Sequence, residues 1–149
     1  SLRYFNVYGP RQINSGAYST VIGVFLTQLK NRQPLTITGD GTIRRDFTYI
    51  DDVVEANILA ARNKKTLKGE IINIGMGKDY SINEVATMVL KVPSSSSEKA
   101  RKEKLLTYIP PRPAESRATL ADNSKAKKIL GWTPKISFAQ GLELTRAYY

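Results

Sequence analysis

The stretch GDGTIRRDFTYIDDV, residues 39–53, determines how the chain around it is organised. Before it, the alternating sequence LTIT at residues 35–38 predicts a strand that runs into the tight glycine turn at 39–41. After that turn, residues 47–50 are rich in types that favour strands. The stretch therefore predicts two strands joined through a turn that carries charged side chains.

A helix is predicted to follow at once. Asp51 and Asp52 offer an N-cap, the position where a side-chain oxygen accepts a free backbone N–H. Val54, Ile58 and Ala61 recur at the spacing of one helical face. We therefore expect a helix with this apolar face.

The remaining sequence alternates short strands and helices. Strands are expected at 3–7 and 70–74, and helices at 18–32, after the capping box at 81–84, at about 124–130, and after the capping box at 137–140. Residues 94–104 combine four serines with a charged tract, which predicts a flexible surface loop. This order predicts an α/β fold, a small mixed sheet with helices, in a single domain over residues 1–149.

Composition excludes several classes of site. The chain has no Cys, so it has no disulfide framework, thiolate zinc site or cysteine nucleophile, and it has no His, so imidazole acid–base chemistry is absent. We expect no metal site. The formal net charge of +10 favours an anionic partner: nucleic acid, anionic lipid or a phosphorylated small molecule.

The membrane and export signals expected of other classes are missing from this sequence. No apolar run reaches the roughly 18 residues that a membrane-spanning helix needs, and residues 1–10 lack the apolar region of a signal peptide. We therefore expect a cytoplasmic protein with no membrane partner.

Two arginines lie in backbone contexts that are unusual for solvated surface charges. Arg45 stands beside Asp46, between the glycine turn and the apolar Phe47, and Arg112 lies inside Pro-Pro-Arg-Pro, residues 110–113. A guanidinium held on rigid backbone suits a phosphate, because its planar fork donates two hydrogen bonds at once. The alternatives are a structural pair between Arg45 and Asp46 and a solvated loop charge at Arg112.

Other polar residues are compatible with binding or with ordinary structure. Asn6 precedes a turn, where its amide has either a ligand oxygen or the turn itself as partner. Thr36 and Thr38 point to one side of their strand, toward a ligand or toward solvent. The basic run at 99–104 has no interleaved aromatic residues, so a solvated loop is favoured over an RNA contact.

The sequence Gly75-Met-Gly77-Lys-Asp-Tyr80 sits between a predicted strand and a predicted helix, as a dinucleotide fingerprint would. Tyr80 occupies the place of the third glycine, which would allow close packing of the helix on the strand. A tight turn is therefore favoured over a dinucleotide site.

Five motifs occur in order along the chain: LRYFNVYGPR at 2–11, the stretch at 39–53, NIG at 73–75, PRPAE at 111–115, and ADNSKA at 121–126 with LGW at 130–132. Together they resemble the C-terminal half of the extended short-chain dehydrogenase/reductase family, within it the NAD-dependent nucleotide-sugar epimerases of the UDP-glucose 4-epimerase type. The resemblance implies the substrate-binding portion of such an enzyme plus edge strands of its Rossmann sheet.

The resemblance assigns roles to residues near the N-terminus. It implies that Tyr4 lies against the nicotinamide, as the one cofactor-binding residue, and that Phe5 lies beside the sugar. Asn6 is expected to hold the diphosphate or the sugar. The backbone around Thr20 and Val21 is expected to line the path of the diphosphate.

It also assigns roles to the central and later residues. Thr36 and Thr38 are expected beside the nucleobase, while Arg45 and Arg112 are expected to clamp the phosphates. Glu115 is expected to accept hydrogen bonds from the ribose hydroxyls. Two guanidinium groups and a carboxylate suit a diphosphate and a vicinal diol.

The sequence departs from the family at two kinds of place. Ala114 stands where the family commonly has Gly, in the loop that carries Glu115, and Gly23 stands where it often has Pro. The family's N-terminal glycine-rich NAD motif and its catalytic Tyr-x-x-x-Lys pair are both missing from this chain. No catalytic residue is therefore assigned, and the N-terminal NAD-binding part is expected to be absent.

The resemblance implies that this chain is the substrate-binding part of an enzyme that epimerises a UDP-sugar at C4 through a 4-keto intermediate. We expect the chain to be inactive alone and to bind no NAD tightly, although the full-length family uses NAD. The exposed strand edges predict a homo-oligomer, a strand-swapped dimer or a separate N-terminal half as partner. The alternatives are a fragment of a nucleotide-sugar 4,6-dehydratase, or a stand-alone module that binds a nucleotide-sugar or RNA.

Overall fold

The computed structural model describes residues 1–13, 16, 19–64, 68–93 and 103–149. Most of the loop predicted at 94–104 lies outside these residues, and its last two residues form a turn. The elements are β1 Leu2–Tyr4, β2 Val7–Tyr8, α1 Val21–Lys30, β3 Leu35–Thr38, β4 Arg44–Asp46, β5 Thr48–Tyr49, α2 Ile50–Arg62, β6 Ile72–Ile74, β7 Asp79–Ser81, α3 Ile82–Leu90, β8 Leu106–Ile109, β9 Ala118–Thr119, α5 Ser124–Leu130 and α6 Phe138–Arg146.

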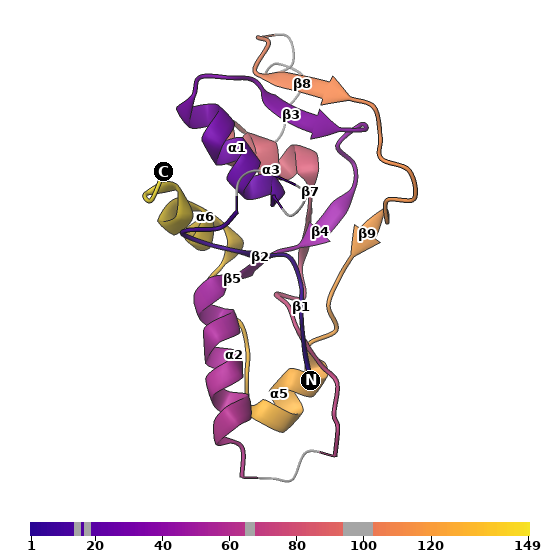
Figure 1. Ribbon diagram of the computed structural model, residues 1–149, viewed down its shortest axis with the longest axis vertical. Coiled ribbons are helices and arrows are strands. Elements are labelled where there is room, and N and C mark those ends of the chain that lie inside the picture. Colours follow the sequence, from indigo (N-terminus) through magenta and orange to yellow (C-terminus); the bar gives the residue numbers. More distant parts are fainter. Residues whose placement is uncertain (14–15, 17–18, 65–67, 94–102) are drawn as a thin grey trace.

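The fold is mixed α/β, as expected, but the described strands form four small sheets rather than one. Three are parallel pairs, β1–β6, β2–β5 and β3–β8, and the fourth has the order β7-β4-β9. Figure 1 shows an elongated molecule with α1, α3, β3 and β8 at one end and α2, α5, β1 and β6 at the other. The central strands β4, β5 and β2 connect the two ends.

The strand predicted at 3–7 is divided in two at Asn6. Asn6 adopts a φ of 31°, which lies outside the extended range and ends β1 before β2 begins. As a result β1 pairs with β6, whereas β2 pairs with β5. Asparagine tolerates positive φ better than most residues, so this break is encoded locally.

The larger of two apolar cores fills the upper end and the middle. It joins the buried side of α1 to β3, α3 and α6, and its centre is an aromatic group in which Phe138 stacks on Phe47 and Tyr80. Tyr8 meets Phe138 edge to face at 5.4 Å. Helix α1 is capped by Thr20, whose hydroxyl accepts the N–H of Gly23.

The smaller core lies between α2, β6, α5 and Trp132. The indole of Trp132 donates to the backbone oxygen of Asp52 at 2.8 Å, and the Asp52 carboxylate accepts the N–H groups of Lys135 and Ile136. The expectation that Asp51 and Asp52 cap α2 was wrong. The cap position is Tyr49, without a side-chain bond, because Asp52 lies inside the first turn and is used to anchor the C-terminal segment.

Helix α2 turns an unexpected side to its core. Its buried residues are Asp52, Val53 and Ala56, whereas the apolar face expected from the sequence is exposed, with Val54 48% and Ile58 43% accessible. The helix therefore has apolar residues on two sides, and only one of them packs within this chain.

Candidate functional site

Two adjoining cavities form a cleft that extends from α1 and β3 to the central strands β2 and β4. Their volumes are about 120 and 280 Å³. Both are lined by Ser19, Val21, Ile82, Arg112 and Glu115. The first cavity adds Val24, Phe25, Thr36, Thr38 and Ile43, and the second adds Asn6, Val7, Tyr8, Thr20, Ile22, Arg45 and Phe47. The cleft thus gathers eight of the ten residues assigned from the sequence.

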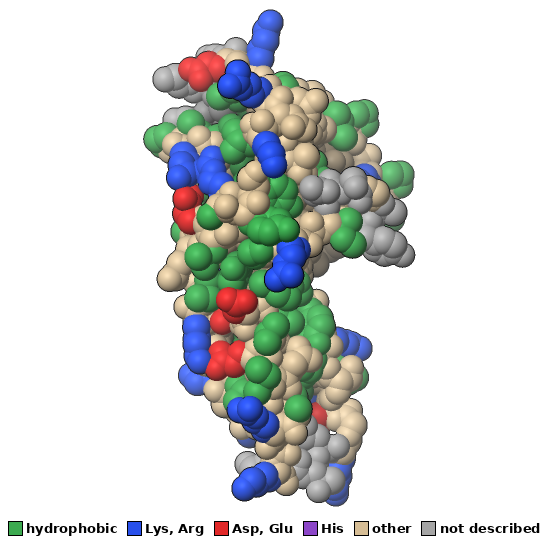
Figure 2. Space-filling view, turned by 60° about the vertical axis from the view of Figure 1, so that its left-hand side comes forward, with side chains coloured by type: hydrophobic (Ala, Val, Ile, Leu, Met, Phe, Trp, Pro, Cys, Tyr) green, Lys and Arg blue, Asp and Glu red, His purple; other side chains and the backbone are tan. Residues whose placement is uncertain are grey.

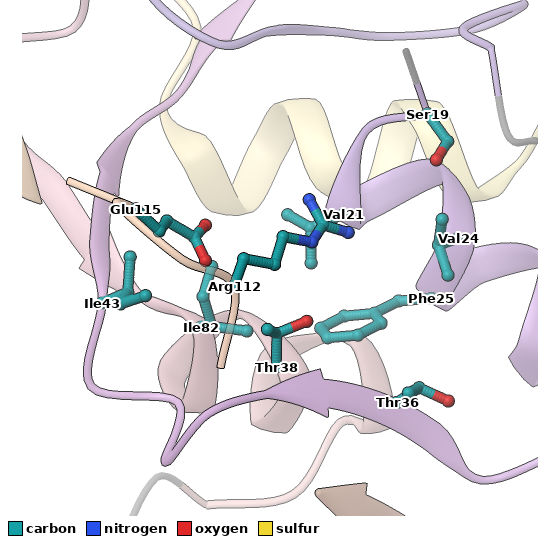
Figure 3. Close-up of a pocket in the computed structure, with 10 residues that line it drawn as sticks. All are labelled: Ser19, Val21, Val24, Phe25, Thr36, Thr38, Ile43, Ile82, Arg112 and Glu115. Atoms are coloured by element: carbon teal, nitrogen blue, oxygen red, sulfur yellow. The ribbon is translucent and has the colours of Figure 1, made fainter. Parts of the chain in front are cut away.

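Arg112 is the cation that this cleft leaves available. It lies in the proline-rich segment between β8 and β9, and Figure 3 shows its guanidinium extended into the cavity toward Val21. It forms no ion pair or hydrogen bond with any described residue. Arg112 is exposed and also lines both cavities, so its guanidinium is accessible to solvent and to a ligand in the cleft.

Arg45 is held by protein groups. Its Nη2 lies 3.1 Å from Glu115 Oε1, and its Nη1 donates to the backbone oxygens of Arg44 and Ser116 at 2.9 and 2.8 Å. The considered pair with Asp46 is not formed, since the buried Asp46 carboxylate accepts backbone N–H groups instead. Arg45 therefore fixes the segment that carries Glu115.

Glu115 has one satisfied and one free oxygen. While Oε1 pairs with Arg45, Oε2 is buried and has no hydrogen-bond partner. A buried carboxylate oxygen without a donor is costly, by about 1–3 kcal/mol. A ligand hydroxyl in the cleft would supply the missing donor.

The two threonines of β3 differ in their use. Thr36 is bonded to Gln28, whose Nε2 donates to the threonine hydroxyl at 2.8 Å and whose Oε1 accepts the Thr36 N–H at 3.1 Å. Figure 3 shows the Thr38 hydroxyl pointing toward the ring of Phe25, whereas the Thr36 hydroxyl turns away. Thr38 is thus the better placed of the two to meet a ligand.

The residues at the other side of the cleft come from the β1–β2 break and the start of α1. Asn6 donates its amide to the backbone oxygen of Asp46 at 2.7 Å and to Thr119 at 3.3 Å, so it serves the local structure while lining the cavity. Thr20 donates to Gln12 Oε1 at 2.8 Å. Val21 lines both cavities.

Tyr4 and Phe5 do not line either cavity of the cleft. Tyr4 is 49% exposed on β1, and its hydroxyl donates to Asn57 Oδ1 on α2 at 2.9 Å. Phe5 donates its N–H to the oxygen of Ile74 at the end of β6. Neither residue therefore joins Arg112 and Glu115 among the residues that line the cavities.

A third cavity of about 300 Å³ extends the cleft past Thr20 along residues 9–13. Sequence reasoning did not assign this segment. Tyr8, which lines the second and third cavities, donates its hydroxyl to the oxygen of Phe138. Burial raises the pKa of the Tyr8 hydroxyl, so this tyrosine stays protonated and is unsuited to act as a base.

The turn at Gly75–Gly77 has no free donors for a phosphate. The N–H groups of Met76 and Gly77 both bind the Asp46 carboxylate, at 2.8 and 2.9 Å. These two N–H groups are therefore not available to the diphosphate of a dinucleotide, and the segment between β6 and β7 bends at Gly75 and Gly77.

Two other kinds of site are missing from the described residues. They hold no cluster of three or more acidic, Cys or His ligands for a metal ion. They also contain no helix with the length and apolarity needed to cross a membrane.

Comparison with known proteins identifies the family of this chain. Residues 1–145 match the family model described as GDP-mannose 4,6 dehydratase. The chain is 40% identical over 145 residues to UDP-glucuronate 4-epimerase of Thermodesulfobacterium geofontis, covering 97% of this chain and 41% of that protein.

Solved structures of nucleotide-sugar epimerases are also similar to this chain. UDP-glucose 4-epimerase of Thermotoga maritima with UDP-glucose is 38% identical with a TM-score of 0.83, over 99% of this chain and 44% of that one. UDP-glucuronic acid 4-epimerase of Bacillus cereus in complex with UDP-glucuronic acid and NAD is 38% identical with a TM-score of 0.82, over 99% and 43%. The chain spans less than half the length of these relatives. It belongs to the GDP-mannose 4,6 dehydratase family, the nucleotide-sugar-modifying enzymes of the extended short-chain dehydrogenase/reductase type.

Proposed function

We propose that this chain is the nucleotide-sugar-binding part of an NAD-dependent epimerase that acts at C4 of a UDP-sugar. The observation that carries the proposal is that Arg112 and Glu115 line the same cleft. The Arg112 guanidinium has no partner among the described residues, and Glu115 Oε2 has no hydrogen-bond donor. A nucleoside diphosphate needs this pair of partners, a cation for its phosphates and an acceptor for its ribose diol.

Each part of the ligand has a matching part of the cleft. The diphosphate lies against Arg112 and the start of α1, where backbone N–H groups and the helix dipole favour negative charge. The ribose hydroxyls donate to Glu115. The base enters the first cavity beside Thr38, over the ring of Phe25.

The sugar then extends through the second cavity toward Asn6 and the third cavity. Arg45 acts here through Glu115, because three of its donor contacts already go to protein oxygens. This differs from the two-arginine clamp that the family resemblance implies, and assigns the direct phosphate contact to Arg112.

Hydride chemistry requires groups that these residues do not supply. The one turn that resembles a dinucleotide loop is occupied by Asp46, and the chain has no Tyr-x-x-x-Lys pair. We infer that the chain alone binds a UDP-sugar without converting it, and that NAD is held by the part of the enzyme that this chain does not span. The net charge of +10 favours the diphosphate, and the titration with RNA below distinguishes this ligand from nucleic acid.

A nucleotide-sugar 4,6-dehydratase is the second candidate, because the matching family model carries that description. Both enzymes bind a nucleoside diphosphate sugar, so the cleft supports them equally. The 38–40% identity to UDP-sugar 4-epimerases favours epimerisation.

Calorimetric titration of the chain with UDP, UDP-glucose, UDP-glucuronic acid and a short RNA tests the proposal. Removing a charge-assisted contact through Arg112→Ala weakens UDP binding roughly 10- to 100-fold. Arg117→Ala is the matched control, since it removes the same charge from the same segment without touching the cavities. Equal losses from both variants, or binding of RNA alone with steep salt dependence, would contradict the assignment.

A further inference from the structure

Asp46 is a buried carboxylate that does not itself line the cleft. It ends β4, is 0% exposed, and is not among the residues that line the three cavities. Figure 2 shows exposed acidic side chains that lie beside Lys and Arg side chains on one face of the molecule. The Asp46 carboxylate instead accepts three backbone N–H groups, those of Met76, Gly77 and Ala121, at 2.8, 2.9 and 3.1 Å.

These three bonds compensate for the burial of the charge. Burial raises the pKa of the Asp46 carboxyl, and the three N–H donors act in the opposite direction. Removing a carboxylate from water costs free energy unless hydrogen bonds replace the lost hydration. The three donors therefore take the place of water around this side chain.

The bonds of Asp46 join segments that are far apart in the sequence. Met76 and Gly77 belong to the turn after β6, whereas Ala121 follows β9. The backbone oxygen of Asp46 also accepts the amide of Asn6 at 2.7 Å, at the break between β1 and β2. One residue thus connects three segments, and Asn6 lines the second cavity.

The bond to Ala121 bears on the segment that carries Glu115. Residues 115–121 run beside β4, and β9 within them pairs in parallel with that strand. Neighbouring residues of β4 hold the two ends of this segment, because Arg45 binds Glu115 and Asp46 binds Ala121. Both bonds are therefore needed to fix the whole segment on β4.

We propose that Asp46 is a positioning residue for the nucleotide-sugar cleft, which acts through Glu115 and Asn6. Its carboxylate fixes the end of the 115–121 segment, and its backbone oxygen fixes the Asn6 amide. The ribose side and the sugar side of the cleft thereby keep a constant spacing, although Asp46 itself does not touch the ligand. The proposal rests on the proposed function, because that function states which ligand Glu115 and Asn6 meet.

Asp52 provides a comparison within the same chain. It is also buried, 2% exposed, and its carboxylate accepts the N–H groups of Lys135 and Ile136 at 2.9 and 3.1 Å. These three residues are not among those that line the three cavities. A carboxylate that only stabilises the fold is expected to behave like Asp52, whereas a positioning residue also changes ligand recognition.

The first test replaces each carboxylate with the matching amide in the intact 149-residue chain. Asp46→Asn and Asp52→Asn are both expected to lower the melting temperature, because each weakens buried hydrogen bonds to a charged group. Calorimetric titration then compares UDP with 2′-deoxy-UDP, which the wild-type chain is expected to bind roughly tenfold more weakly. In Asp46→Asn this preference is expected to fall to roughly twofold or less, because Glu115 is no longer held in place. Asp52→Asn is expected to keep the wild-type preference.

Amide exchange of the wild-type chain provides a second readout that needs no variant. If Asp46 positions the cleft for the ligand, the coupling is reciprocal, so UDP also strengthens the Asp46 bonds. Saturating UDP is expected to slow exchange of the three amides that bind Asp46 roughly tenfold more than that of the two amides that bind Asp52. The two amides at Asp52 report the protection that the whole chain gains from the ligand.

Four results would each overturn the proposal: no preference for UDP in the wild type, an unchanged preference in Asp46→Asn, the same loss of preference in both variants, or equal slowing of the two sets of amides. If Asp46→Asn does not fold, the exchange measurement on the wild-type chain decides.

The proposed function is judged separately. If the wild-type chain binds no UDP, the proposed function and the positioning role fail together. If the chain binds UDP and Arg112→Ala weakens that binding, while the readouts at Asp46 do not change, the positioning role alone fails.

Discussion

Arg45 Nη2 lies 3.1 Å from Glu115 Oε1, and the same guanidinium also holds the backbone oxygen of Ser116, so one side chain sets the position of the carboxylate. The other carboxylate oxygen, Oε2, is left buried and unpartnered beside the cleft. The relationship links β4 to the segment that follows β8, which lie far apart in the sequence. It yields two predictions on ligand binding.

Glu115→Gln is expected to abolish discrimination at the ribose. If Oε2 accepts a ribose hydroxyl, the wild-type chain binds UDP roughly tenfold more tightly than 2′-deoxy-UDP, because one hydrogen bond to a charged group is lost with the deoxy ligand. The variant is expected to bind both about equally. Calorimetry with the two nucleotides measures the ratio, and a variant that keeps the wild-type ratio would show that Glu115 does not contact the sugar.

Arg45→Lys tests positioning separately. A lysine keeps the charge but replaces the planar fork that contacts Glu115 and Ser116 at once. We expect the preference for UDP over 2′-deoxy-UDP to fall together with affinity, because Glu115 is released. If affinity for both nucleotides falls by the same factor, Arg45 contacts the phosphates directly, as the family resemblance implies.

Local signals were sufficient for the ends of α3, α5 and α6 but not for the start and buried face of α2 or for the assembly of strands. Capping residues Ser81 and Ser137 and the terminal Gly131 marked helix ends that the structure confirms, because these interactions span only a few residues. The strand at 3–7 was predicted whole. Asn6 permits the break locally, but the two halves pair with different strands, β6 and β5, more than 40 residues away, and no local spacing predicts those pairings.

The sequence predicted which residues line the cleft better than it predicted which of their side chains contact one another. Arg112 and Glu115 entered the cleft as the family resemblance implied, while the pairing of Arg45 with Glu115 joins residues 70 apart and carries no sequence spacing signal. Asp52 was misassigned for the same reason. Its carboxylate binds N–H groups of a segment more than 80 residues later, which outweighs its local tendency to cap α2.

Ala114→Gly is expected to stabilise the chain. Ala114 has a φ of 57°, a left-handed conformation that costs an L-residue about 1–2 kcal/mol and glycine almost nothing. Part of the gain is offset by the greater freedom of glycine in the unfolded state, which leaves roughly 0.5 kcal/mol. Urea unfolding measures the difference. The control Ala61→Gly, in α2, is expected to destabilise, and the same sign for both would refute the strain at Ala114.

Gly75→Ala is expected to destabilise the junction between β6 and the segment before α5. A Cβ at Gly75 would lie 2.2 Å from the Cβ of Ala121 and 3.1 Å from the carboxylate of Asp46. Overpacking of this kind costs about 1–3 kcal/mol. Adding Ala121→Gly removes the nearer clash and is expected to restore part of the loss in urea unfolding. A double variant no more stable than Gly75→Ala would place the strain elsewhere.

Glu84 is expected to make stability depend on pH in the acid range. The backbone N–H of Ser81 donates to its carboxylate at 2.7 Å, and this bond, with a further contribution from Arg44, lowers the pKa of Glu84 below its usual 4.5. Since the folded state holds the proton less tightly than the unfolded state, the stabilisation is complete above pH 4.5 and is lost as the pH falls through the folded pKa.

Glu84→Gln is expected to lower the free energy of unfolding by roughly 0.5 kcal/mol at pH 7, because the group is partly solvated. In acid the free energies of unfolding of the variant and the wild type are expected to become equal. Urea unfolding at pH 7 and at the acid end of the folded range measures both. Ser137→Ala is the control, because it removes a cap from α6 whose partner, the N–H of Gln140, does not titrate, so its cost is the same at each pH; a gap for Glu84→Gln that stays constant with pH would exclude the carboxylate as its source.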